Sequence, residues 1–221
     1  MTDITQVRRS YHAFIANPRA ADSPCPSPSS WPMWRGVPVI KYPADLLTYH
    51  EIICTTRPDL IIECGTAFGG SALFFADTMR ALRHGKVVTV DVRKRRLRTT
   101  CDKRVTFIVG SSISTEVVGR IAELARGQRT MVILDSSHRA KHVAKELDLY
   151  WGMVSPGCYL VVEDTILNNH PMQQDLRPGP YEALQPFLAE HGEEFEQMPW
   201  SNKTMVSLNI GGWLRRRGGD G

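Results

Sequence analysis

Residues 60–79 hold the feature that most constrains the fold, because three local patterns follow one another there without a gap. The apolar run at 60–62 is too short for a helix and predicts a buried strand. Three glycines follow between positions 65 and 70, and residues 72–79 then carry apolar side chains at helical spacing. A buried strand, a glycine turn and a helix open a doubly wound α/β sheet, and the bare helix N-terminus can meet a ligand.

The spacing of the glycines decides between two classes of ligand. A dinucleotide site has the pattern G-x-G-x-x-G, but Ala67 stands where its second glycine would be. The order Glu63-x-Gly65-x-x-x-Gly69-Gly70 resembles instead the first motif of S-adenosylmethionine-dependent methyltransferases. The pattern therefore favours an adenosyl donor over a nicotinamide cofactor.

Composition bounds the size and the surroundings of the protein. A chain of 221 residues, 42% hydrophobic and 23% charged, has room for one α/β domain with N-terminal additions. The sequence has no apolar run of membrane-spanning length and no signal-peptide pattern at its start. The five cysteines are widely spaced without a CxxC motif, which indicates reduced thiols and no zinc site. We expect a cytoplasmic protein without a membrane span.

The formal net charge of +4 is concentrated in two basic segments, at 93–104 and at 215–217. Such segments can bind nucleic acid, or they can be a solvated face and a basic tail. Aromatic residues that would stack on bases are not interleaved with these charges. We therefore expect no nucleic-acid partner.

Strands and helices alternate along the chain, which predicts a mostly parallel sheet of seven strands with helices on both faces and an antiparallel edge strand. After the strand at 60–63, strands are expected at 86–91, 105–109, 131–134 and 159–162, with the antiparallel edge at 204–209. Helices are expected from Pro43 to about residue 53 and at 114–126, 140–154 and 181–191. Three regions are expected: an N-terminal helix with a Pro/Ser-rich, lid-like loop at 1–33, the α/β domain at 34–215 and a flexible tail at 216–221.

Acidic residues stand at the ends of four of the five parallel strands. They are Glu63, Asp91, Asp135 and the adjacent pair Glu163 and Asp164. Because parallel strands end at one edge of a sheet, these carboxylates repel one another unless ligands or a cation neutralise them. Helix capping is an alternative for Asp135, but it does not explain two adjacent acids.

Two of the strand ends are expected to face an adenosyl group. Asp91 can accept both ribose hydroxyls, although a nicotinamide enzyme would place an acid there too. Ser111 and Ser112 follow the third strand, where they can contact the adenine or simply form a turn.

The other two strand ends predict a metal site. Asp135, Glu163 and Asp164 offer three hard oxygen donors, which suit Mg²⁺. His138 lies three residues after Asp135 and should point towards the same ion. It is either a structural histidine or a general base for the hydroxyl that is methylated.

With these residues in place, the chain resembles the cephalosporin hydroxylase/rhamnosyl O-methyltransferase family of class I methyltransferases. The stretches that carry the resemblance are 34–38, 57–63, 69–72, 134–138, 159–165 and 179–183. The resemblance implies that Glu63, Gly65, Gly69, Ser71 and Asp91 hold the donor. Thr66, Ser111, Ser112 and Asp135 complete the donor site that we expect. It implies that Asp135, Glu163 and Asp164 hold the metal and that Asp135 and His138 are catalytic. In the similarly arranged catechol O-methyltransferases a lysine occupies the offset of His138.

The function that the resemblance implies is methylation of a sugar hydroxyl, on a rhamnoside or mannoside, with S-adenosyl-L-methionine and Mg²⁺ as cofactors. The acceptor would be a small molecule or an oligosaccharide, and we expect a homodimer. A natural product without a sugar is the alternative acceptor. An alternative of another class is a non-catalytic module that binds anionic polymers through the 93–104 segment.

Overall fold

The strand expected at 60–63 is β3 (Leu60–Cys64), the central strand of a computed structural model that describes residues 32–93, 102–167, 178–204 and 206–218. All five of its residues are buried. β3 pairs in parallel with β4 (Lys86–Asp91) on one side and with β6 (Thr130–Leu134) on the other. A strand flanked on both edges and covered on both faces has no polar side, which explains its continuous apolar run.

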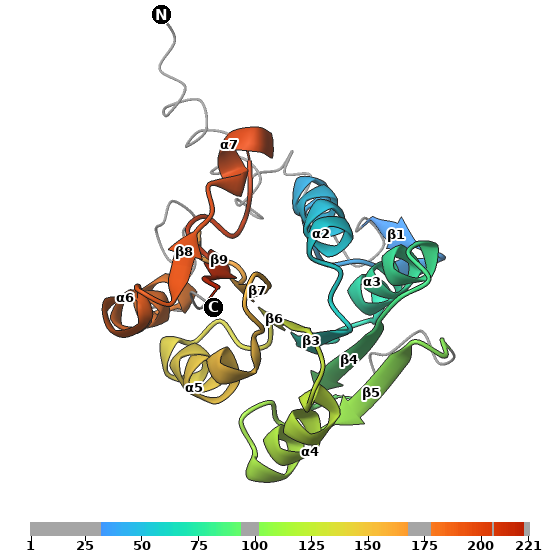
Figure 1. The fold of residues 1–221 in the computed structure, drawn as a ribbon, viewed down its shortest axis with the longest axis horizontal. Helices are drawn as coiled ribbons and strands as arrows, with labels where there is room; N and C mark the ends of the chain where they lie inside the picture. Colours follow the sequence, from blue (N-terminus) through green and yellow to red (C-terminus); the bar gives the residue numbers. More distant parts are fainter. Residues whose placement is uncertain (1–31, 94–101, 168–177, 205, 219–221) are drawn as a thin grey trace, which may run out of the picture.

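The sheet is doubly wound, with the strand order β5-β4-β3-β6-β7-β9-β8 (Figure 1). The chain builds outward from β3 to β5 (Val105–Val109), then returns across β3 to β6 and β7 (Tyr159–Val162). The point where this order reverses lies between β3 and β6, and ligands of such sheets bind beside it. β8 (Phe195–Gln197) and β9 (Trp213–Arg216) complete the sheet as antiparallel strands. The predicted α/β class is confirmed.

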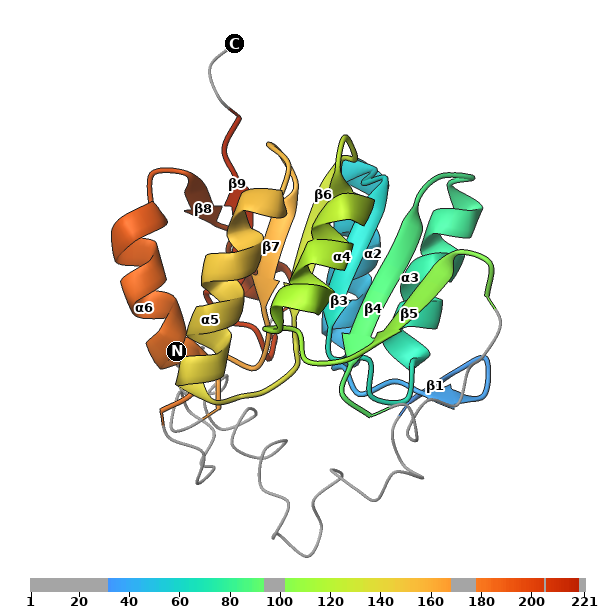
Figure 2. The ribbon, with the colours of Figure 1, turned by 90° about the horizontal axis from the view of Figure 1, so that it is seen from below.

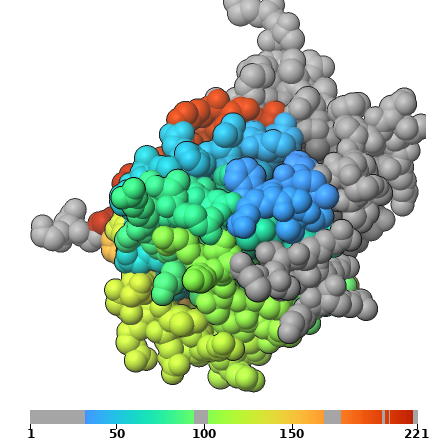
Figure 3. Space-filling model, turned by 90° about the vertical axis from the view of Figure 1, so that its right-hand side faces the viewer, coloured from blue at the N-terminus to red at the C-terminus, as the bar shows by residue number. Residues whose placement is uncertain are grey.

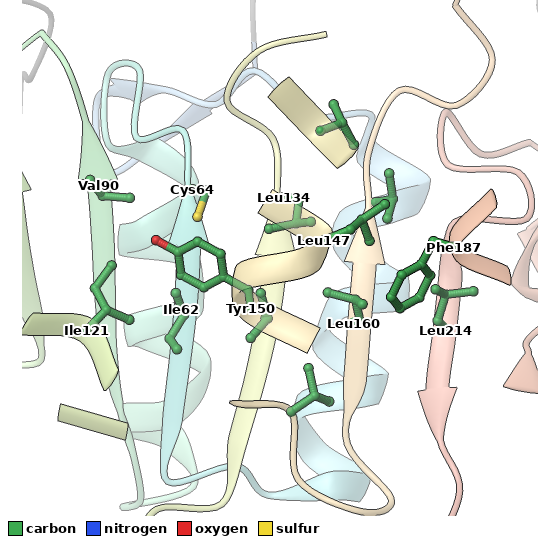
Figure 4. Close-up of a cluster of buried hydrophobic side chains, with 14 of the residues drawn as sticks. Ile62, Cys64, Val90, Ile121, Leu134, Leu147, Tyr150, Leu160, Phe187 and Leu214 are labelled. Carbon is green, nitrogen blue, oxygen red and sulfur yellow. The ribbon is translucent and has the colours of Figure 1, made fainter. Parts of the chain in front are cut away.

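Helices cover both faces of the sheet (Figure 2). On one face lie α2 (Pro43–Thr56) and α3 (Gly70–Ala81), and on the other lie α4 (Thr115–Ala125), α5 (Ala140–Tyr150) and α6 (Pro180–His191). The alternating side chains of β3 point into different halves of the core. Ile61 packs in the cluster that holds α2 and α3, whereas Ile62 packs in the cluster that includes Ile121, Tyr150 and Phe187 (Figure 4).

The described start of the chain forms a small hairpin of β1 (Met33–Trp34) and β2 (Val37–Pro38) that lies on α3. The indole Nε1 of Trp34 donates to Asp77 Oδ2 at 2.8 Å, and its ring meets Phe74 edge-on. A Cβ on Gly70 would lie 2.2 Å from the carbonyl oxygen of Pro38, so this contact requires glycine. In Figure 3 these blue residues lie against the cyan and blue-green residues of the α2–α3 region.

The predicted edge strand at 204–209 is wrong. Thr204 ends the short helix α7 (Trp200–Thr204), and residues 206–209 belong to no strand. Leu208 instead packs against Ile166 and Leu167, and its amide donates to the Asp45 carboxylate of α2. The polar residues on either side of it, Ser207 and Asn209, are buried. The antiparallel edge is formed by β8 and β9. The helix expected at 140–154 ends at Tyr150 and continues as one 3-10 turn at Trp151–Met153.

Several expectations fall on residues that the structure does not describe. These are the N-terminal helix, the Pro/Ser-rich loop up to residue 31, residues 94–101 of the basic segment and the last residues of the tail. Among the helices that are described, none has both the length and the apolarity needed to span a bilayer.

Candidate active site

The acidic residues predicted at strand ends lie at one edge of the sheet. Asp91 is the last residue of β4, Asp135 directly follows β6, and Glu163 and Asp164 directly follow β7. Glu63 differs from them, because it lies inside β3 and is fully buried.

A cavity of about 110 Å³ opens beside the point where the strand order reverses. It is lined by Gly65, Val90, Asp91, Val92, Gly110, Ser111, Ser112, Ser136, Ser137 and His142. The structure thus brings together four residues that were predicted to hold the donor, namely Gly65, Asp91, Ser111 and Ser112. His142, on α5, was not predicted, and its Nε2 lies 3.2 Å from the Ser112 hydroxyl.

The glycine turn is shaped by its contact with the neighbouring strand end. Gly65 has a φ of 108°, and a Cβ there would lie 1.8 Å from the carbonyl oxygen of Asp135. Any other residue at this position would separate the ends of β3 and β6. The Ala67 amide donates to Asp91 Oδ2 at 2.9 Å, and the Arg93 amide donates to Asp91 Oδ1 at 2.8 Å. Each carboxylate oxygen keeps a lone pair for a further donor, such as a ribose hydroxyl.

The remaining predicted donor residues lie in or beneath the turn, outside the lining of this cavity. Thr89 donates to Glu63 Oε2 at 2.6 Å, and the Thr66 and Thr89 hydroxyls are 2.6 Å apart. Glu63 Oε1 is buried and has no hydrogen-bond partner among the described residues. Burial raises the pKa of Glu63. Gly69 and Ser71 start α3, where Gly69 adopts a left-handed conformation and Ser71 is buried.

On the other side of Asp135, three possible ligand atoms converge. His138 Nε2 lies 3.0 Å from Asp164 Oδ2 and 3.6 Å from Asp135 Oδ1. The three ligand atoms all lie within 4.8 Å of one another, and the three residues are partly exposed. The two carboxylates offer hard oxygen ligands that fit a divalent cation such as Mg²⁺, and the imidazole lies beside them.

Glu163, the third predicted metal ligand, already has two donors. Lys41 Nζ donates to Glu163 Oε1 and, at 2.8 Å, to Asp135 Oδ2. The Tyr49 hydroxyl donates to the same Glu163 oxygen at 2.6 Å. Sequence reasoning missed both donors. The one signal for Lys41 was a lone charge in the otherwise apolar stretch that leads into α2.

Burial and charge act in opposite directions on the pKa values in this cluster. Burial lowers the pKa of Lys41, but the charges of Asp135, Glu163 and Glu63 outweigh it and raise the pKa. Burial alone would raise the pKa of Asp135, yet the Lys41 ammonium and His138 lower it. The pKa of Glu163 is raised, by burial first and then by the charge of Asp135.

The imidazole of His138 responds to the same charges. Burial lowers its pKa, but the hydrogen bond to Asp135 and the charges of Asp164 and Asp135 raise it to about 9. A cation beside these carboxylates would offset the charges that raise this pKa.

A buried carboxylate ties α2 to the segment between α7 and β9. Asp45 accepts the Leu208 amide through Oδ2 at 2.9 Å, while its Oδ1 has no partner among the described residues. The next residue, Asn209, accepts the Asp164 amide through its side-chain oxygen at 2.9 Å. Burial raises the pKa of Asp45 to about 6, despite the opposing Leu208 hydrogen bond.

Comparison with known proteins gives a consistent result. Residues 29–217 match the model of a family described as rhamnosyl O-methyltransferase/CmcI. A rhamnosyl O-methyltransferase of Mycobacterium tuberculosis is 36% identical over 168 residues, or 74% of this chain and 69% of that protein. The Mycobacterium leprae enzyme of the same name is 35% identical over 167 residues, or 74% of this chain and 73% of that protein.

A solved structure of CmcI with Mg and SAM shares the fold. Its TM-score is 0.64 with 20% identity, and the match covers 99% of this chain and 97% of that one.

The buried Asp45 carboxylate predicts a pH dependence of stability. Its folded pKa of about 6 exceeds the usual carboxyl value of 3.8, so the folded state binds the proton more tightly. Stability associated with Asp45 is therefore present at low pH and lost as pH rises through about 6. Relative to Asp45→Asn, the wild-type free energy of unfolding should fall by on the order of 2 kcal/mol between pH 4.5 and 7. Urea titrations of both proteins in chelator measure this difference, and parallel pH profiles would contradict it.

Proposed function

The chain belongs to the rhamnosyl O-methyltransferase/CmcI family. We propose that it transfers the methyl group of S-adenosyl-L-methionine to a sugar hydroxyl. Mg²⁺ binds at the acidic cluster, which consists of Asp135, Glu163, Asp164 and His138. The likeness to rhamnosyl O-methyltransferases supports a rhamnoside-type acceptor. A location in the cytoplasm and a homodimer are part of the same proposal.

The observation that carries this proposal is that the loop at residues 135–138 contributes side chains to both the cavity and the acidic cluster. Ser136 and Ser137 line the cavity beside Gly65 and Asp91, whereas Asp135 and His138 point into the acidic cluster. A donor held in the cavity and a hydroxyl held at the cluster would therefore be neighbours. Methyl transfer requires this arrangement, because the acceptor oxygen must approach the methyl carbon directly.

The donor site follows from the cavity. The two oxygens of Asp91 are oriented by the amides of Ala67 and Arg93, which leaves them to accept the ribose hydroxyls. Ser111, Ser112 and His142 form the far wall, which suits the adenine. Glu63 supports the turn from beneath, through Thr89 and Thr66.

The reaction forms a bond between the acceptor oxygen and the methyl carbon and breaks the bond between that carbon and the sulfonium sulfur. A divalent cation bound by the carboxylates would lower the pKa of the acceptor hydroxyl. In the metal-free site His138 Nε2 faces Asp164 Oδ2 at 3.0 Å. A cation that engages this carboxylate would free Nε2 to accept the hydroxyl proton. Asp135 stands between the donor cavity and the cluster and fixes their separation through its backbone contact with Gly65.

The full chain should methylate a rhamnoside acceptor with labelled S-adenosyl-L-methionine, and the product should be a methyl ether. Activity should be lost in EDTA and restored by Mg²⁺, because the carboxylates would then lack their cation. Scintillation counting across rhamnoside, mannoside and non-sugar acceptors measures both effects. Transfer that is unaffected by chelation would contradict the metal assignment, and transfer only to non-sugar acceptors would contradict the acceptor class.

Asp91→Ala should weaken the binding of S-adenosylhomocysteine by about tenfold or more, because a charged acceptor contributes about 1.5–3 kcal/mol per hydrogen bond. Titration calorimetry on the folded variant measures this loss. Asp148→Ala is the matched control, since Asp148 is an exposed acid on α5. Unchanged affinity in Asp91→Ala would remove Asp91 from the donor site.

His138→Ala should lower kcat by roughly 10²–10⁴-fold, the usual contribution of a general base. Affinity for S-adenosylhomocysteine and for Mg²⁺ should change little, because a base does not hold either one. Kinetics, calorimetry and melting curves on the same preparations separate the alternatives. Weaker Mg²⁺ binding would make His138 a metal ligand instead, and a lower melting temperature with near-normal kcat would make it structural.

A further inference from the structure

Lys41 is a buried lysine in the centre of the acidic cluster. Its side chain is 1% exposed, and Nζ is hydrogen-bonded to Asp135 Oδ2 and Glu163 Oε1. An ammonium removed from water is costly unless it is paired, so this position depends on the two carboxylates. They depend on Lys41 in turn, because without it two neighbouring acids would face each other across a buried site.

The fold delivers Lys41 to this position from outside the sheet. The β1–β2 hairpin is fastened to α3 by Trp34 and by the contact between Pro38 and Gly70. Lys41 follows that hairpin directly and precedes Pro43, the first residue of α2. Tyr49, two turns into α2, donates to the same Glu163 oxygen and holds it in place.

Lys41 occupies carboxylate oxygens that a divalent cation would need. Of the predicted ligands, Asp135 uses one oxygen for Lys41, and Glu163 accepts both Lys41 and Tyr49 on Oε1. Asp135 Oδ1 and Asp164 Oδ2 instead face His138. Two cations that share one set of carboxylates repel each other and compete for the same charge.

We propose that Lys41 is a built-in competitor of the divalent cation. Its ammonium holds Asp135 and Glu163 together in the metal-free protein, and a bound ion must draw these carboxylates away from it. Lys41 thereby weakens metal affinity and keeps the metal-free site assembled. The inference rests on the proposed function, because it concerns the same metal site.

The test compares Mn²⁺ binding to the wild-type chain and to Lys41→Met, which keeps the length of the side chain but removes its charge. Electron paramagnetic resonance of free Mn²⁺ gives the dissociation constants, and melting curves are recorded in EDTA and in Mn²⁺. Lys41→Met should bind Mn²⁺ roughly tenfold more tightly or better. In EDTA the melting temperature of Lys41→Met should be lower than that of the wild type. Mn²⁺ should reduce this difference in melting temperature, since the ion replaces the lost positive charge.

Lys203→Met is the matched control, because Lys203 pairs with Glu51 on the surface and its side chain is 60% exposed. It should leave Mn²⁺ affinity unchanged. Tyr49→Phe keeps the buried ring and removes one donor from Glu163, so it should tighten Mn²⁺ binding by a smaller factor, roughly threefold. This second variant carries the test if Lys41→Met does not fold without metal.

The outcomes separate this inference from the proposed function. Equal or weaker Mn²⁺ binding by folded Lys41→Met, or by Tyr49→Phe where Lys41→Met does not fold, would overturn the competition even if the wild type binds Mn²⁺ and transfers methyl groups. A wild-type chain that neither binds Mn²⁺ nor depends on a divalent cation for methyl transfer would overturn both. Tighter binding in both variants and an unchanged control would establish it.

Discussion

Electrostatic repulsion among the carboxylates of Asp135, Glu163 and Asp164 is the constraint on which the functional edge of the sheet depends. The carboxyl ends of neighbouring parallel strands lie at the same edge of the sheet, so the strand order brings these acids together. Without cations the folded state would be destabilised, because like charges in a buried site repel one another. In the described residues the positive charge comes from Lys41 and His138. The segment before α2 therefore has an electrostatic role as well as a packing role.

The same edge shows how two sites can be coupled through backbone rather than through side chains. The ends of β3 and β6 touch at Gly65 and Asp135, with no space for a Cβ between them. Gly65 lines the proposed donor cavity, and Asp135 belongs to the acidic cluster. A rigid separation between donor and acceptor is what methyl transfer needs, since misplacement by about 1 Å can cost 10²-fold in rate.

Much of the fold could be predicted because its signals are local. The continuous apolar run of β3 and the glycine turn behind it indicate a buried central strand, and each parallel strand was placed within a residue or so. The meeting of Gly65, Asp91, Ser111 and Ser112 followed from the rule that parallel strands end at one edge. What failed depended on distant contacts. Leu208 packs on Ile166 and Leu167 and donates its amide to Asp45 of α2. Arg215 and Arg216, which were grouped with a basic tail, lie in β9.

The contributions of Lys41 and Tyr49 could not be predicted for the same reason. Tyr49 lies in the helix expected from Pro43, but nothing local shows that its hydroxyl reaches Glu163, 114 positions along the chain. A single lysine in an apolar stretch is equally consistent with an exposed end of a loop. Only the strand order, which sets β6 and β7 beside each other, brings their acids within its reach.

The loop at residues 135–138 has a consequence for how this family can vary. Its two outer residues, Asp135 and His138, face the acidic cluster, and the two residues between them line the proposed donor cavity. The number of residues in the loop therefore matters as much as their identity. Single replacements alter one of the two sites. An insertion or deletion of one residue would move the later side chains of the loop by one position. Side chains that now face one site would then face the other. Relatives that use the same donor and cation should therefore keep the length of this loop constant.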